Sequence, residues 1–65
     1  MNLTEARKLK VGDPVITCNG KYRQHGRVTA IEPHHSGNGF WISFRWTTRD
    51  KAFYGRKRHQ SVYLP

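Results

Sequence analysis

The chain has 65 residues, with 12 Lys or Arg against 4 Asp or Glu, so its formal net charge is +8; 35% of the residues are apolar and 12% are aromatic. A chain this short buries only about 60% of the surface that its unfolded form exposes, which allows one small domain, residues 1–65, and excludes a second catalytic lobe. The single cysteine, Cys18, excludes an internal disulfide.

The first predicted element is a short helical turn at residues 4–9. Thr4 is the expected N-cap, and Leu3, Ala6 and Leu9 recur at about helical spacing. A single turn is not stable alone. We therefore expect Leu3 and Leu9 to pack over one end of a neighbouring sheet.

From Gly12 onward the pattern changes to short strands and turns. β-Branched residues favour a strand at residues 15–18, and a second strand is expected at residues 26–31. Between them, Asn19–Gly20 is a strong signal for a two-residue turn. These elements predict a hairpin.

The clearest strand is predicted at residues 40–46, after a break at Pro33 and a Ser-Gly-Asn-Gly run. Alternate side chains should point to opposite faces. The face expected to join the core carries Phe40, Ile42, Phe44 and Trp46, and the opposite face carries Trp41, Ser43 and Arg45.

The C-terminal third predicts two further strands. A turn at residues 47–50 leads into a strand at 51–54, which Gly55 is expected to end, and residues 61–64 suit a last short strand. Five short strands without a long helix indicate an all-β fold, and at this length a small barrel.

Residues 12–31 resemble a KOW motif, the Gly-Asp-x-Val, then Gly, then Gly-x-Val pattern of SH3-like barrels in some ribosomal proteins and NusG-type elongation factors. The residues themselves predict that Val15 and Val28 share a core and that Gly20 and Gly26 adopt positive φ where the loop reverses. The resemblance implies a small five-stranded SH3-like barrel with a short N-terminal helical turn. It also implies that the loop at residues 21–25 contacts nucleic acid.

The charge balance indicates a polyanionic partner. Two Trp, three Tyr and three Phe residues accompany the basic excess, which is untypical of a disordered basic tail. A polyanion would relieve the repulsion among the positive charges. We therefore expect a nucleic-acid-binding domain, with the choice between DNA and RNA open.

Two groups of residues suit that function. Trp41 and Arg45 share the strand face opposite the core, where Trp41 could stack a base and Arg45 could contact a phosphate; alternatively, Trp41 packs under the helical turn or the last strand. The run at residues 56–59 is the densest positive segment and is expected on a loop, where phosphate contacts are easy. The residues expected to bind nucleic acid are Lys21, Arg23, Arg27, Trp41, Arg45, Arg49, Lys51, Arg56, Lys57 and Arg58.

We expect no enzyme activity, metal site or cofactor. His34 and His35 are adjacent but have no acidic or thiol ligand close in sequence, and Cys18 is expected to be a buried, inert thiol in a strand. No stretch approaches the ~18 apolar residues of a membrane helix, and the first residues lack the order of a secretion signal. The expected compartment is the cytoplasm, without membrane association.

Two other functions remain open. A protein-interaction module, such as a small regulator or inhibitor docking on an acidic partner, would use Trp41, Phe53, Tyr54 and the arginines, because these residue types dominate interface energetics. The chain is also similar to plasmid-type dihydrofolate reductases in its Gly-Asp-x-Val opening and its Val62–Tyr63 pair, but their Val-Gln-Ile-Tyr strand is missing. Neither pattern reveals the oligomeric state.

Overall fold

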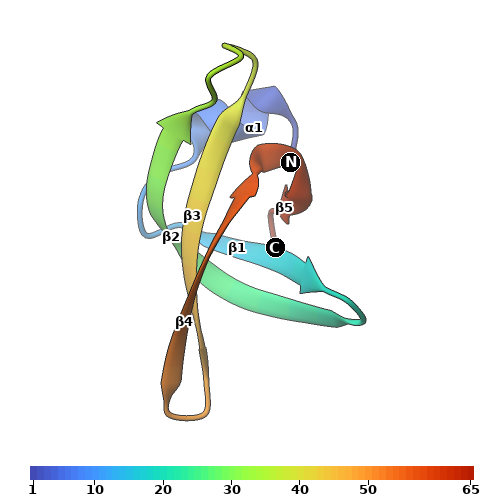
Figure 1. Ribbon diagram of the computed structural model, residues 1–65, viewed down its shortest axis with the longest axis vertical. Helices are drawn as coiled ribbons and strands as arrows, with labels where there is room; N and C mark the ends of the chain where they lie inside the picture. Colours follow the sequence, from blue (N-terminus) through green and yellow to red (C-terminus); the bar gives the residue numbers. More distant parts are fainter.

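Five antiparallel strands form one sheet in the order β4-β3-β2-β1-β5, with a short helix at the N-terminal end (Figure 1). The computed structural model describes the backbone of residues 1–65 and every side chain except that of Asn19. The elements are α1 (Leu3–Lys8), β1 (Pro14–Asn19), β2 (Tyr22–Pro33), β3 (Phe40–Thr48), β4 (Lys51–Arg58), the 3₁₀ turn η1 (His59–Ser61) and β5 (Val62–Tyr63). The prediction of a β-rich fold with a short N-terminal helix is confirmed.

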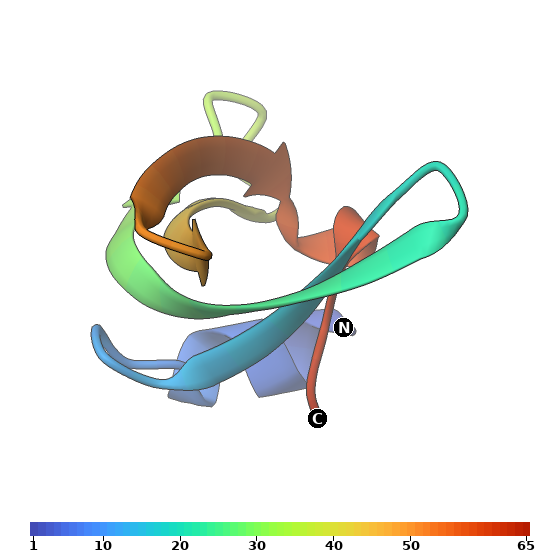
Figure 2. The same cartoon turned by 90° about the horizontal axis from the view of Figure 1, so that it is seen from below.

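The sheet curls strongly but does not close, so the expectation of a closed barrel is wrong (Figure 2). In the described backbone, the edge strands β4 and β5 do not pair with each other. The strand β5 has only two residues, and both pair with β1, at Ile16↔Tyr63 and Thr17↔Val62. The last strand therefore extends the β1 edge of the sheet and leaves the β4 edge unpaired.

The centre of the sheet divides into two hairpins that point in different directions (Figure 1). Pairing between β2 and β3 ends at Arg27↔Arg45, after which β2 pairs only with β1 and β3 only with β4. We call the parts beyond this pair the β1–β2 arm (residues 15–26) and the β3–β4 arm (residues 46–53). They diverge beside Gly26, where an added Cβ would lie 2.7 Å from the carbonyl oxygen of Arg45. The absence of a side chain at Gly26 therefore allows the two backbones to approach closely. The positive φ that was expected at Gly26 is not observed.

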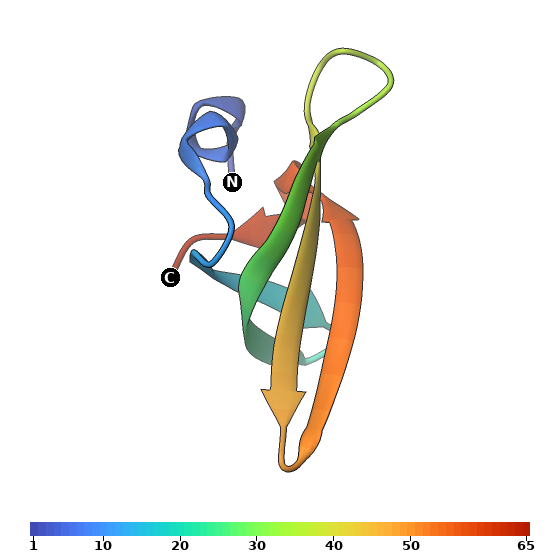
Figure 3. The ribbon, with the colours of Figure 1, turned by 90° about the vertical axis from the view of Figure 1, so that its left-hand side faces the viewer.

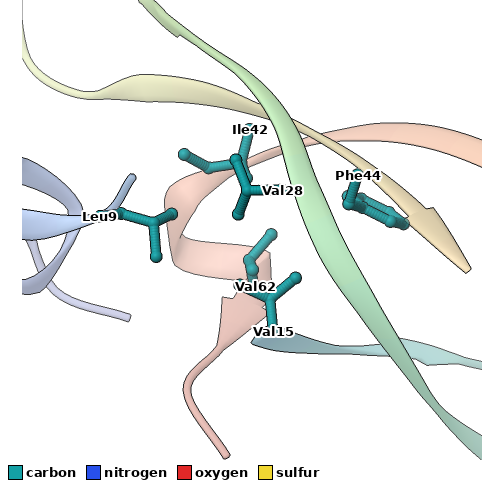
Figure 4. Packing of buried hydrophobic residues seen from close by; sticks show 6 residues of the cluster. All are labelled: Leu9, Val15, Val28, Ile42, Phe44 and Val62. Carbon is teal, nitrogen blue, oxygen red and sulfur yellow. The ribbon is translucent and has the colours of Figure 1, made fainter. Parts of the chain in front are cut away.

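The core lies on the inner, concave side of the curled sheet, and α1 covers the same side (Figure 3). Its buried apolar side chains come from five separate segments and converge on one another (Figure 4): Leu9, Val15, Val28, Ile42, Phe44 and Val62. The shared burial of Val15 and Val28 was predicted, as was the inward face of β3, on which Phe40 and Trp46 pack against the cluster. The opposite face of the sheet is consequently free of the core.

The N-cap of the helix is Asn2, two residues before the predicted Thr4. The Asn2 side chain accepts a hydrogen bond from the Glu5 N–H at 2.8 Å, and Glu5 accepts one from the Asn2 N–H at 3.0 Å. This reciprocal capping box requires an acceptor three residues after the cap, and Glu5 meets that condition for Asn2. Leu9 is buried as expected.

The first hairpin turns at Gly20–Lys21, one residue later than predicted. Asn19 and Tyr22 are backbone partners across the turn, and Gly20 adopts a φ of 63°. The strand β2 starts at Tyr22, so the loop expected at residues 21–25 is almost entirely strand. The hairpin is longer than predicted, and six consecutive residue pairs between β1 and β2 stabilise it.

Strand β4 continues through Gly55 to Arg58, against the prediction that Gly55 ends it. Gly55 is the partner of Phe44 in β3, and an added Cβ would lie 2.7 Å from Cζ of the Phe44 ring. The glycine therefore makes room for a core side chain and does not break the strand. Residues 56–58 consequently lie on a strand and not on the expected loop.

Cys18 is exposed, which corrects the expectation of a buried thiol. Val15 and Thr17 of β1 face the core, and alternation along the strand directs Ile16 and Cys18 to the other side. None of the helices in the described chain is long and apolar enough to cross a membrane.

Candidate nucleic-acid interface

The side of the sheet opposite the core carries most of the candidate residues. In β3, Ile42 and Phe44 point into the core, so alternation turns Trp41, Ser43 and Arg45 outward. Their partners in β4 are Arg58, Arg56 and Tyr54. We call this surface the outer face; its residues are Arg27, Ala30, Glu32, Trp41, Ser43, Arg45, Tyr54, Arg56 and Arg58.

These side chains form three rows across β2, β3 and β4. The register gives Glu32–Trp41–Arg58, then Ala30–Ser43–Arg56, then Arg27–Arg45–Tyr54. A β-bulge between Val28 and Ala30 shifts β2 by one residue. The shift keeps Ile31 packed against the core while Glu32 lies on the outer face.

Trp41 lies beside Arg56 and Arg58, and not beside Arg45 as predicted. The guanidinium carbon of Arg56 is 4.5 Å from the centre of the indole ring, and that of Arg58 is 5.9 Å away. The His34 ring also contacts Trp41, with centroids 5.3 Å apart. Trp41 is half-buried, and its ring packs against two arginines.

Few carboxylates neutralise the outer face. The one ion pair among the described side chains joins Arg56 Nη2 to Glu32 Oε2 at 3.4 Å, with half or more of each side chain exposed. An exposed pair of this kind contributes only about 0–1 kcal/mol. The guanidinium groups of Arg27, Arg45 and Arg58 have no carboxylate partner among the described residues.

The positive potential of this face also acts on His34. Partial burial of the ring, followed by the charges of Arg58, His35 and Arg56, lowers the pKa of His34 below its ordinary value of 6.5. A ring that resists protonation beside two arginines is consistent with local positive charge. The Nε atom of Arg58 is itself buried and has no hydrogen-bond partner among the described atoms.

The structure brings together half of the ten predicted residues and separates the others. The outer face holds Arg27, Trp41, Arg45, Arg56 and Arg58. Arg23 points to the same side of the sheet but lies further along the β1–β2 arm, and Lys21 is in its turn. Arg49 and Lys51 lie at the end of the β3–β4 arm.

Lys57 and His59 do not join the basic surface that the run at 56–59 predicted. Lys57 lies between Arg56 and Arg58 on β4 and points to the opposite side, where its Nζ donates a hydrogen bond to the Cys18 carbonyl at 3.0 Å. His59 is buried, and its Nδ1 accepts a hydrogen bond from the Phe40 N–H at 3.3 Å. Strand alternation therefore divides four consecutive residues between different environments.

Tyr54 is an outer-face residue that the predicted nucleic-acid set lacks. It is 70% exposed and is the backbone partner of Arg45. Its alternation with Arg56 and Arg58 is visible in the sequence once Gly55 is kept inside the strand. Treating Gly55 as a strand end concealed this signal.

No protein-family model, curated protein or solved structure matches the chain. Within the described part of the chain, no three His, Cys, Asp or Glu residues group closely enough to hold a metal ion.

Proposed function

We propose that the protein is a non-enzymatic nucleic-acid-binding domain that contacts backbone phosphates through its outer face. The observation that carries this proposal is the gathering of four guanidinium groups on one face of three adjacent strands, where Glu32 is the only carboxylate among the described residues. The four are Arg27, Arg45, Arg56 and Arg58.

The chemistry of arginine suits this role. Its planar group presents five N–H donors and binds phosphate oxygens in pairs. Neighbouring strands lie about 4.8 Å apart, so the face offers closely spaced donors on a rigid sheet. The cation–π contacts with Trp41 restrict Arg56 and Arg58 further, which reduces the entropy lost when they bind.

The KOW-like resemblance of residues 12–31 supports the same proposal, because the motif occurs in ribosomal proteins and elongation factors. Those residues form the hairpin of β1 and β2, with Val15 and Val28 in one core. We propose that the open, curled sheet is related to the SH3-like barrels and lacks only their closure.

A second candidate function is docking on an acidic surface of a partner protein. A depression favours it, because apolar side chains lie beside a cation there: Ile16, Cys18, Arg23, Tyr63 and Leu64. Tyr63 is 50% exposed and Leu64 is 42% exposed, and such residues contribute strongly to interfaces.

Fluorescence anisotropy with labelled single-stranded DNA, duplex DNA and structured RNA, each at two ionic strengths, tests the first proposal. We expect the double variant Arg56→Gln/Arg58→Gln to bind at least tenfold more weakly at low salt, since charge-assisted hydrogen bonds are worth about 1.5–3 kcal/mol each. The matched control is Lys57→Gln, which removes the same charge from the same strand on the opposite side.

Two outcomes would reject the proposal: no binding of any oligonucleotide at low salt, or equal losses of affinity for Lys57→Gln and for Arg56→Gln/Arg58→Gln. A pull-down from nuclease-treated lysate then tests docking. A stoichiometric protein partner that survives the nuclease, and that Tyr63→Ala releases, would support the second function.

A further inference from the structure

The outer face contains two arginines that directly oppose each other. Arg27 in β2 and Arg45 in β3 are backbone partners in an antiparallel pair, and both are exposed. Like charges at directly opposite positions repel each other. Among the described side chains, no carboxylate lies within ion-pair distance of either guanidinium group. An anion placed between them would remove this repulsion.

Both arginines line a depression at the point where the two arms diverge. Its volume is about 540 Å³, within the range of roughly 300–1,000 Å³ that is typical of ligand sites. Its other lining residues include His25, Thr29 and Thr47, and none of its lining residues is acidic. The depression therefore has the charge and size that an anionic group requires.

Arg27 is held in place before any ligand arrives. Its Nη1 donates a hydrogen bond to the Gly12 carbonyl at 2.9 Å, which anchors one end of the guanidinium group. The remaining N–H groups are available to an oxyanion. A donor that is already positioned loses little conformational freedom on binding.

Tyr54 completes the row on the other side of Arg45. The two residues are backbone partners, and the Tyr54 ring is 70% exposed. Adjacent strands lie about 4.8 Å apart, so the open ring is one strand from the guanidinium pair. That separation suits the phosphate and the base of a single nucleotide. Trp41, the other outer-face aromatic, has Arg56 over its ring.

We propose that Arg27, Arg45 and Tyr54 form a nucleotide subsite, in which the guanidinium groups bind one backbone phosphate and Tyr54 stacks on one unpaired base. A base stacked on a side chain must be free of its complement. The protein therefore prefers single-stranded nucleic acid to a duplex. This inference rests on the proposed function and identifies the form of its ligand.

The test uses a labelled ten-nucleotide oligothymidylate, the same strand annealed to its complement, and a version with abasic sites. Tyr54→Ala should weaken binding of the single strand about 5- to 150-fold, the effect of losing one stacked base, whereas Tyr54→Phe should bind like the parent. The matched control is Tyr22→Ala, which removes a tyrosine that is 76% exposed near the tip of the β1–β2 arm. On the abasic strand, the parent and Tyr54→Ala should bind equally.

The arginines have a separate readout. Arg27→Gln and Arg45→Gln should each reduce the slope of log affinity against log salt by about 0.7, the value for one single-strand phosphate. Inorganic phosphate serves as a competitor for a free-anion site. Displacement of the oligonucleotide by phosphate at equal concentration would overturn the proposal in favour of free phosphate.

The result that overturns the subsite differs from the one that overturns the proposed function. If the duplex binds as tightly as the single strand, or if Tyr54→Ala binds like the parent while Arg56→Gln/Arg58→Gln does not, the subsite is wrong and nucleic-acid binding stands. If no oligonucleotide binds at low salt, both are wrong. Should Tyr54→Ala fail to fold by circular dichroism, Tyr54→Leu removes the aromatic ring with less change in bulk and gives the same comparison.

Discussion

The guanidinium carbon of Arg56 lies 4.5 Å from the centre of the Trp41 indole ring, on the side of the sheet away from the core. Contacts of this kind contribute about 0.5–1 kcal/mol at exposed sites. Trp41 thus has a structural part in the candidate interface, since its ring packs against the guanidinium group of Arg56.

The contact between Trp41 and Arg56 predicts energetic coupling. In a double-mutant cycle, Trp41→Leu and Arg56→Gln should show a coupling free energy of about 0.5–1 kcal/mol in urea unfolding, because each substitution removes the same cation–π contact. Trp41→Leu with Arg45→Gln is the control pair, and their effects should add. Additive effects for Trp41 and Arg56 would show that the contact has no net energy.

Gly55→Ala should lower the free energy of unfolding by about 1–3 kcal/mol, as overpacking of a filled core does. The new Cβ would lie 2.7 Å from Cζ of Phe44, so the ring must move. Ala52→Gly on the same strand is the comparison, with an expected loss of roughly 0.5–1 kcal/mol from backbone freedom. If strand propensity alone governed both positions, Gly55→Ala would stabilise the protein instead.

Gly55 also explains where sequence interpretation failed. A glycine in a strand pattern suits either a strand end or a close approach, and the deciding fact is the position of Phe44, which is 11 residues away in the sequence. Ending the strand at Gly55 placed Arg56 and Arg58 on a loop and hid their alternation with Tyr54. The pattern of β3, by contrast, was predicted correctly because alternation is a local property.

Closure of the sheet was the other feature that the sequence could not settle. It depends on whether the last strand pairs with β4 as well as with β1, and the two residues of β5 pair with β1 alone. The buried pair Val15 and Val28 could be predicted, because each is a β-branched residue at a fixed place in the Gly-Asp-x-Val and Gly-x-Val patterns. The pairing of Arg27 with Arg45 could not, because it depends on the bulge after Val28.

Asn2→Ala should destabilise the protein by about 1 kcal/mol, since it removes the side chain that caps α1. Thr4→Ala provides the matched control, because Thr4 lies inside the helix and is exposed. Its expected effect is within about 0.5 kcal/mol of zero. Thermal or urea unfolding measures both, and a larger loss for Thr4→Ala would contradict the capping box.

The lowered pKa of His34 predicts a pH dependence of stability. Partial burial and then the charges of Arg58, His35 and Arg56 depress it, so the unfolded state binds more protons than the folded state between that pKa and 6.5. The free energy of unfolding should therefore rise with pH across this window. The contribution of His34 to it should be lost as the pH falls below 6.5. His34→Gln should remove that part of the dependence in urea unfolding on either side of pH 6.5.

Binding of a polyanion should act on the same group in the opposite direction. Phosphates beside Arg56 and Arg58 would offset the positive charges that disfavour protonation of His34, so its pKa should rise when an oligonucleotide is added. Titration of the imidazole signals by NMR, with and without the oligonucleotide, measures the change. An unchanged pKa at saturation would place the ligand away from these arginines.

The most direct test of the central claim is the salt dependence of oligonucleotide affinity for the parent and for the variant with Arg27, Arg45, Arg56 and Arg58 all changed to Gln. If these four arginines each contact a phosphate, the log–log slope for a single strand should be about −2.8, at roughly 0.7 per phosphate. The fourfold variant should then approach a flat line, while a variant with Arg7, Lys8, Lys10 and Lys57 changed to Gln keeps the slope of the parent. A flat titration for the parent, or equal slopes for the parent and the fourfold variant, would contradict nucleic-acid binding by the outer face.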